Sequence, residues 1–212
     1  MKPYKMAIFD LDGVIVDTAK YHYLAWRELA ERLGFEFTQE HNERLKGVSR
    51  WRSLEILLEV GGMPDKFTDA EKEDMANEKN KRYVGYISQL REDEILPGAR
   101  ELIARMKENG IKTAIGSASK NTPLILERLG IADLFDVVID GNSTQKAKPD
   151  PEVFVLGAKA MDVPPGDCIV FEDAQAGIDA ALAAGMTPIG VGDPHNLVGA
   201  EIHVPALKDF IF

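Results

Sequence analysis

Four acidic side chains stand in two closely spaced pairs, Asp10 with Asp12 and Glu172 with Asp173. Each pair lies at the end of a short apolar run, where a buried strand would finish. Carboxylates that converge repel one another unless a cation lies between them. Mg²⁺ takes one or two carboxylates together with carbonyl and water oxygens, usually beside a phosphate of the substrate. The two pairs therefore predict a metal site.

The spacing within the first pair suggests two different catalytic roles. Asp10 and Asp12 are two residues apart, so in an extended segment both side chains face the same way. One carboxylate could attack as a nucleophile while the other gives and takes a proton. Any single acid after a strand is more often a plain turn residue. Four acids, two serines and a lysine at separate strand ends favour chemistry.

The serines belong to the stretch Ser117-Ala118-Ser119-Lys120-Asn121, which follows another apolar run and leads into a helical pattern. Backbone N–H groups and hydroxyls at such a helix start can cradle a phosphate. The plainer interpretation is N-capping by Ser119 or Asn121, and the two uses are compatible.

The remaining candidate is Lys148, which precedes a Pro149-Asp150-Pro151 segment of restricted, extended backbone. A solvated surface charge is the alternative. The chain carries 35 acidic and 25 basic residues, a net charge of −10, which on average repels nucleic acid and anionic membranes. A protein of this charge that handles an anion must build a local positive site. We therefore expect neither a nucleic acid nor a membrane partner.

The elements that position these groups alternate along the chain. The expected strands are short, rich in Val, Ile or Phe, and cover residues 6–9, 112–116, 135–139, 168–171 and 186–191. Helical patterns separate the later ones, over residues 99–109, 121–129, 151–161 and 176–184. Such alternation predicts parallel strands with crossover helices. The expected fold class is α/β, a three-layer Rossmann-like core with a parallel sheet.

Residues 17–92 break this rhythm, because they show helical patterns without a convincing strand. We expect an inserted helical cap domain over 17–92 and a catalytic core made of 1–16 and 93–212. The crossings near Val16 and Asp93 are hinge candidates. The lone cysteine, Cys168, excludes an internal disulfide and is expected to be a core thiol. No apolar run approaches the roughly 20 residues of a membrane span, and the expected location is cytoplasmic.

Four motifs in order give the chain a family resemblance. The stretches Phe9-Asp10-Leu11-Asp12-Gly13-Val14, Ser117, Lys148-Pro149 and Glu172-Asp173 resemble those of the haloacid dehalogenase superfamily. Within it, the chain is similar to the β-phosphoglucomutase family over nearly its whole length. The further matches are Asp17-Thr18-Ala19, Tyr21-His22, Trp26, Leu45-Lys46-Gly47-Val48-Ser49-Arg50 and Lys79-Asn80.

The resemblance implies catalytic roles in the core. Asp10 would be the nucleophile that becomes an aspartyl phosphate, and Asp12 the general acid and base. Mg²⁺ would be held by Asp10, the backbone carbonyl of Asp12, Glu172 and Asp173. Ser117 and Lys148 would hold the transferring phosphoryl group.

The resemblance also implies a substrate and its contacts. The substrates would be β-D-glucose 1-phosphate and glucose 6-phosphate, interconverted by an isomerase through β-glucose 1,6-bisphosphate in carbohydrate metabolism. The binding residues would be Thr18, His22, Trp26, Lys46, Gly47, Val48, Ser49, Arg50, Lys79, Ala118, Ser119, Lys120 and Asn121. We expect a monomer. The alternatives are a phosphatase with the same phosphoaspartate and a silent phosphosugar-binding protein. Trp51 departs from the family pattern and could alter what the cap accepts.

Overall fold

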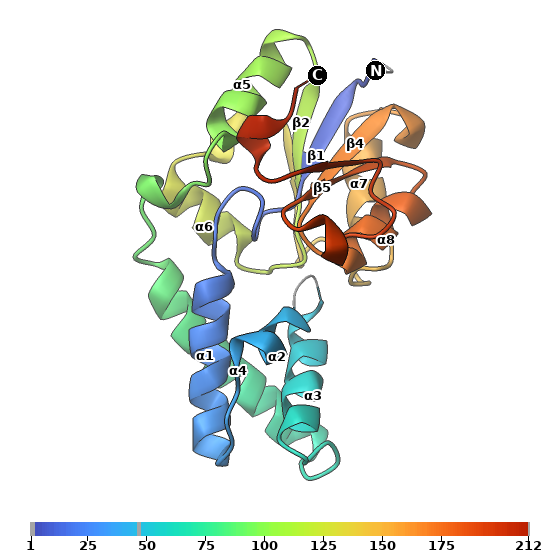
Figure 1. Ribbon diagram of the computed structural model, residues 1–212. Helices are drawn as coiled ribbons and strands as arrows, with labels where there is room; N and C mark the ends of the chain where they lie inside the picture. The colour runs from blue at the N-terminus through green and yellow to red at the C-terminus, as the bar shows by residue number, and fades with distance from the viewer. Residues whose placement is uncertain (1–2, 46–47, 212) are drawn as a thin grey trace.

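The computed structural model describes residues 3–45 and 48–211 (Figure 1). Its central sheet has six strands: β1 (Met6–Phe9), β2 (Lys112–Gly116), β3 (Val137–Ile139), β4 (Cys168–Glu172), β5 (Thr187–Val191) and β6 (Ile202–Val204). The helices between them are α5 (Ala99–Glu108), α6 (Thr122–Leu129), α7 (Glu152–Ala160) and α8 (Gln175–Ala183). The expected alternation of strands and helices is confirmed.

Every strand pair in the sheet is parallel, in the order β3-β2-β1-β4-β5-β6. The chain adds strands outward from β1 to β3, then returns to place β4 on the other side of β1. Ligands of open parallel sheets bind where the strand order reverses in this way, beyond the carboxyl ends of the strands. The two acidic pairs follow β1 and β4, the strands that flank this switch point.

The sheet is covered on both faces. Along β1, Ala7 and Phe9 enter one apolar cluster and Met6 and Ile8 enter another, as the alternation of side chains in a strand requires. Helices α5 and α6 lie against the first face, and α7 and α8 against the second (Figure 1). All four β1 residues are fully buried. The expected three-layer core is confirmed.

The core differs from expectation at two strands. The run 135–139 becomes a strand only from Val137, because the Phe135 amide donates to the Ala132 carbonyl of the preceding turn. Strand β6 was not expected, since it is three residues long and exposes His203. So short a run, with a polar residue at its centre, carries no clear periodicity.

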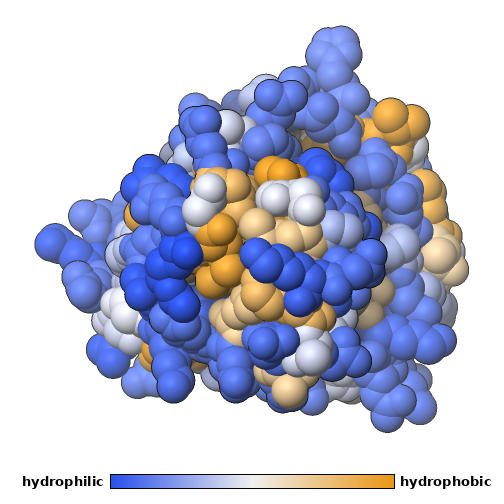
Figure 2. Space-filling model, turned by 90° about the horizontal axis from the view of Figure 1, so that it is seen from below, coloured by the Kyte–Doolittle hydropathy of each residue, from blue (hydrophilic) through white to orange (hydrophobic). Residues whose placement is uncertain are grey.

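Four helices form the separate region below the sheet in Figure 1: α1 (Ala19–Leu33), α2 (Gln39–Glu43), α3 (Arg50–Val60) and α4 (Asp69–Ile87). The five-residue α2 was not expected. These helices enclose their own apolar cluster, built on side chains such as Trp26, Phe37 and Leu57. Seen from the end of this region, the surface is mostly hydrophilic around a small apolar area (Figure 2). Among residues 3–45 and 48–211, no helix has the length and apolarity of a membrane span.

The two connections between the helical region and the core run side by side. Val16 forms an antiparallel bridge with Ile95, and the Leu96 amide donates to the Ile15 carbonyl at 2.9 Å. The Glu94 carboxylate accepts hydrogen bonds from Lys20 at 2.7 Å and from Tyr21 at 2.6 Å. The chain thus leaves and re-enters the core at one place, close to both expected hinge positions.

Candidate active site

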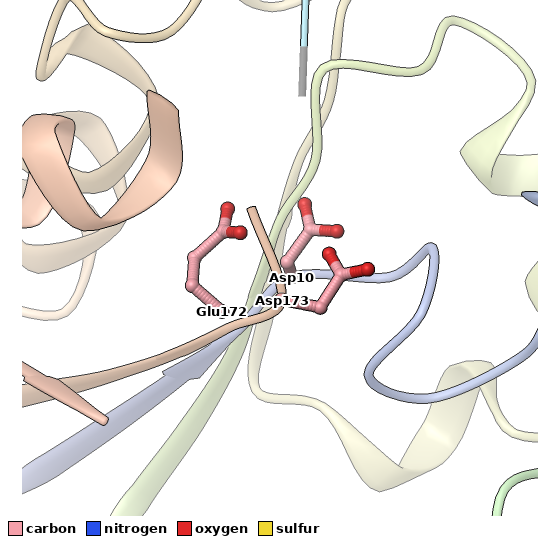
Figure 3. A group of neighbouring side chains, drawn as sticks. All are labelled: Asp10, Glu172 and Asp173. Atoms are coloured by element: carbon pink, nitrogen blue, oxygen red, sulfur yellow. The ribbon is translucent and has the colours of Figure 1, made fainter. Parts of the chain in front are cut away.

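Three carboxylates converge at the switch point of the sheet. Asp10 follows β1, Glu172 ends β4, and Asp173 comes next along the chain (Figure 3). One oxygen of each lies within 4.8 Å of one oxygen of the other two. The pairing of β1 with β4 places these acids next to each other, because Phe9 pairs with Phe171 and the Asp10 backbone amide donates to the Phe171 carbonyl. Phe9 and Phe171 also stack, with ring centroids 4.8 Å apart.

Two glycines leave room for these carboxylates. A Cβ atom on Gly177, at the start of α8, would overlap the Glu172 carboxyl group. A Cβ atom on Gly13 would overlap the Asp173 carboxyl group, and Gly13 also has φ of +83°. The backbone therefore brings two acids to where oxygen ligands of a hard cation belong. The chemistry and closeness of the three donors fit a divalent metal ion.

Lys148 reaches the same place from the loop before α7. Its ammonium group donates to the Asp10 carboxylate at 2.6 Å and also to the Glu172 carboxylate. The side chain is buried, with 4% of its surface exposed. Burial alone would lower the pKa of Lys148, but the two carboxylates outweigh it and raise the pKa above its usual value. Burial raises the pKa of Glu172 to about 7, against the opposing effect of Lys148.

Asp12 has a different environment from Asp10. Its carboxylate accepts a hydrogen bond from the Thr18 hydroxyl, and Thr18 is fully buried at the start of α1. Burial, together with the nearby Asp10 carboxylate, raises the pKa of Asp12 to about 7. A group with a pKa close to neutral exchanges protons readily at neutral pH, as a general acid or base must.

The serine stretch after β2 is only partly as expected. Ser117 is fully buried, and its hydroxyl accepts from the Ser119 amide at 3.1 Å. The Ser119 hydroxyl accepts from the Asn121 amide at 3.2 Å, so Ser119 forms a turn and does not cap the helix. Asn121 is the N-cap residue of α6 but makes no capping bond with its side chain. The side-chain amide of Asn121 instead donates to the side-chain oxygen of Asn80 on α4 at 3.0 Å. This hydrogen bond joins the core to the helical region.

The helical region faces the carboxylates with buried basic groups. The Lys79 ammonium lies 2.8 Å from Nδ1 of His22 and above the rings of Trp26 and Tyr83. Burial is the main reason why the pKa of Lys79 lies well below its usual value, and the positive charge of nearby Arg50 is the second. Burial, followed by Lys79, lowers the pKa of His22 likewise. An anion entering this space would reverse these shifts, because it stabilises the charged forms.

One cavity connects the carboxylates with these basic groups. It is open to solvent and encloses about 110 Å³ of space that water can reach. Asp10, Asp12 and Asp173 lie on the side of the core, and His22, Arg50 and Lys79 on the side of the helical region. Arg50, the first residue of α3, is half-buried. The cavity thus has an acidic wall and a basic wall.

Most residues predicted for the site line this cavity. They are Asp10, Asp12, His22, Trp26, Val48, Arg50, Lys79, Ala118, Ser119, Asn121 and Asp173. Thr18, Ser117, Lys148 and Glu172 are buried close to it. Ser49 and Lys120 line a neighbouring cleft instead, and the Ser49 hydroxyl accepts from the Arg52 amide as the N-cap of α3. Lys46 and Gly47 lie outside the described residues.

The site also contains residues that the sequence did not point to. Asn42 on α2 and Ser53 on α3 line the cavity, and Tyr83 stacks on His22 with ring centroids 3.9 Å apart. Trp51, which departs from the family pattern, lines the neighbouring cleft, and its indole donates to Glu55 at 3.0 Å. A buried polar residue such as Asn42 has no signal in the sequence when the helix that carries it is too short to predict.

Comparisons with known proteins agree with this geometry. The β-phosphoglucomutase of Bacillus subtilis (strain 168) is 45% identical, over 97% of this chain and 91% of that protein. A phosphorylated carbohydrates phosphatase of Thermotoga maritima is 33% identical, over 90% of this chain and 85% of that protein. A crystal structure of β-phosphoglucomutase from Clostridium difficile superposes with a TM-score of 0.94 and 45% identity, covering 99% of this chain and 94% of the other.

The family assignment rests on a match to most of the chain. The family model for haloacid dehalogenase-like hydrolases matches residues 4–185, which include all four motifs and the helical region. The expected superfamily is thereby confirmed. The chain belongs to the haloacid dehalogenase-like hydrolase family.

Proposed function

We propose that the protein is a Mg²⁺-dependent phosphomutase that interconverts β-D-glucose 1-phosphate and glucose 6-phosphate. The observation that carries the proposal is the cavity with a carboxylate wall facing a wall of basic groups, of which Lys79 is buried. A reaction through β-glucose 1,6-bisphosphate needs a site for each of two phosphates. The 45% identity to the B. subtilis β-phosphoglucomutase supports the choice of sugar.

On the core side, Asp10 is the proposed nucleophile, which attacks phosphorus and becomes an aspartyl phosphate. Lys148 is placed to orient the Asp10 carboxylate, since its ammonium lies 2.6 Å from it. Asp10, Glu172 and Asp173, with the backbone carbonyl of Asp12, would hold Mg²⁺. When bound, the ion supplies positive charge that stabilises the transferring phosphoryl oxygens. Ser117 and Lys148 would bind the same oxygens.

Asp12 is the proposed general acid and base. Its pKa of about 7 lets it deliver a proton to the leaving sugar oxygen and take one from the attacking hydroxyl. The hydrogen bond from Thr18 fixes the direction of its carboxyl group. Thr18 begins α1, so the position of Asp12 is linked to that of the helical region.

On the opposite wall, Arg50 is the proposed anchor for the second phosphate. A guanidinium group grips a phosphate through two parallel hydrogen bonds. A phosphate in this position would stabilise the charged forms of His22 and Lys79. Because the sugar bisphosphate must offer either phosphate to Asp10, it has to bind in two orientations. A phosphate site away from the metal is therefore part of mutase chemistry.

The helical region, residues 17–92, would act as a cap domain over the core of residues 1–16 and 93–212. An aspartyl phosphate must be shielded from water, so the cap should close on the sugar. The crossings near Val16 and Asp93, which run side by side at the bridge between Val16 and Ile95, form the proposed hinge. Both walls of the cavity come from one chain, which supports action as a monomer.

A phosphatase is the competing function. The 33% identity to the phosphorylated carbohydrates phosphatase of T. maritima supports it, but less strongly than the 45% identity supports the mutase. A phosphatase would pass the phosphoryl group from Asp10 to water. It has less need of the basic wall, because a monophosphate occupies the metal side alone. Two functional acids argue against a silent binding protein, since binding alone needs no proton donor beside the metal.

The test is a partition measurement with purified protein and Mg²⁺. β-Glucose 1-phosphate, primed with β-glucose 1,6-bisphosphate, should yield glucose 6-phosphate much faster than free phosphate. Both products are measured in the same reaction over a panel of sugar phosphates. Free phosphate appearing as fast as glucose 6-phosphate would establish the phosphatase instead.

A further inference from the structure

One polar side chain in the cavity wall has no role in the scheme above. Asn42 lies on α2, is 7% exposed, and lines the cavity together with Trp26, Leu45 and Val48. Its backbone is satisfied: the amide donates to the Thr38 carbonyl at 3.1 Å, and the carbonyl accepts from the Leu45 amide at 2.9 Å. The side chain alone is left to be accounted for.

The side-chain carbonyl oxygen of Asn42 is buried and has no hydrogen-bond partner among the described residues. Two other neutral polar side chains of this wall have partners: Ser53 donates to the Ser49 carbonyl at 3.0 Å, and the Asn80 side-chain oxygen accepts from Asn121 at 3.0 Å. A buried acceptor without a donor destabilises a protein, and nearly all such groups find a partner. An unpaired acceptor in a ligand cavity is therefore explained if the ligand supplies the donor.

The position of Asn42 decides what kind of donor that is. The charged groups of both cavity walls account for phosphates and metal, whereas Asn42 stands among apolar side chains of the cap. A sugar held by its phosphates at two walls turns its ring hydroxyls toward the space between. Resting on the proposed hexose phosphate substrate, we propose that Asn42 is a specificity-determining residue whose side-chain carbonyl accepts a hydrogen bond from a ring hydroxyl.

The test measures binding, so that it is independent of turnover. Calorimetry compares glucose 6-phosphate with its 2-deoxy, 3-deoxy and 4-deoxy analogues, in the presence of Mg²⁺. The wild-type protein should bind one analogue about tenfold more weakly than glucose 6-phosphate, the usual effect of one neutral hydrogen bond. Asn42→Leu should bind glucose 6-phosphate about tenfold more weakly, and should not distinguish that analogue from the parent sugar.

A matched control and a stability measurement separate binding from folding. Asn77→Ala alters an exposed asparagine of α4, and should leave the pattern of affinities as in the wild type. Asn42→Leu removes an unsatisfied polar group, so its melting temperature should equal or exceed that of the wild type. The inference would be wrong if all three deoxy analogues lost the same affinity relative to glucose 6-phosphate, both in the wild type and in Asn42→Leu. A lower melting temperature with unchanged binding would also overturn it. A failure of mutase chemistry would instead appear only in turnover.

Discussion

Two lysines are buried at opposite walls of the cavity, 4% and 3% exposed, and their surroundings differ completely. Lys148 donates to two carboxylates, and its pKa is raised above the usual value despite burial. Lys79 lies against His22 and two aromatic rings, and burial and Arg50 lower its pKa. The first lysine has its counter-ions within the fold. For the second, the Asp12 carboxylate raises the pKa but does not outweigh burial and Arg50.

The two lysines differ in whether the fold itself supplies their counter-ions. On the core wall, Lys148 offsets part of the charge of the carboxylates, and a divalent cation would offset more of it, so Lys148 serves the structure as well as the chemistry. On the cap wall, buried Lys79 lies beside the half-buried His22 and Arg50, and a bound phosphate would stabilise the charged forms of these basic groups. Burial of polar groups at the expense of stability is typical of binding sites.

The largest expected effect is on the core wall. Asp10→Asn should abolish formation of the phosphoenzyme, because an amide cannot take its place as nucleophile. The measurement is incubation with acetyl phosphate and Mg²⁺, followed by mass spectrometry of the peptides. Asp12→Asn is the matched control, which should still be phosphorylated at Asp10 but turn over about 10²–10⁴-fold more slowly. Phosphate on any other peptide in Asp10→Asn protein would exclude Asp10 as nucleophile.

Metal removal should be next in size. Excess chelator, or Asp173→Ala, should lower turnover by about 10³-fold or more, since a bound cation is worth several kcal/mol of transition-state stabilisation. Mg²⁺ should restore activity to the chelated wild type. Asp193→Ala, which removes an exposed acid outside the group of three carboxylates, serves as the control. Full activity in Asp173→Ala would show that the metal site is misplaced.

The two lysines should affect folding in opposite directions. Lys148→Met leaves Asp10 and Glu172 without their partner and should lower the free energy of unfolding by about 3–5 kcal/mol without metal. Lys79→Met should leave it unchanged or raise it by about 1–2 kcal/mol. Urea unfolding at pH 7 measures both, and equal losses in the two variants would remove the distinction between the walls.

The contribution of Lys79 to the free energy of unfolding should also depend on pH. Between the lowered pKa of folded Lys79 and its ordinary value of about 10.4, the unfolded chain binds more protons than the folded one. Lys79 therefore makes the free energy of unfolding rise with pH across that window. Lys79→Met should show a smaller rise between pH 7 and pH 9 than the wild type does.

The core wall could be predicted from the sequence because strand ends locate it. Each acidic pair of this wall comes at the end of an apolar run, and parallel strands bring their carboxyl ends to one edge. The cap wall depends on how four helices pack, which periodicity does not give. His22, Arg50 and Lys79 came from the family resemblance. Asn42 was missed because its helix has five residues, and the turn role of Ser119 was missed because hydrogen bonds within loops leave no pattern.

The central claim is that the cavity holds two separate phosphate sites, and Arg50→Ala tests it most directly. The rate of Asp10 phosphorylation by acetyl phosphate is compared with the rate of glucose 6-phosphate formation in the same protein preparation. Phosphorylation should be nearly unchanged, because acetyl phosphate needs only the core wall. Glucose 6-phosphate formation should fall by about 10- to 100-fold, the worth of charged hydrogen bonds to the second phosphate. An unchanged mutase rate, or an equal fall in both rates, would contradict a second site on the cap.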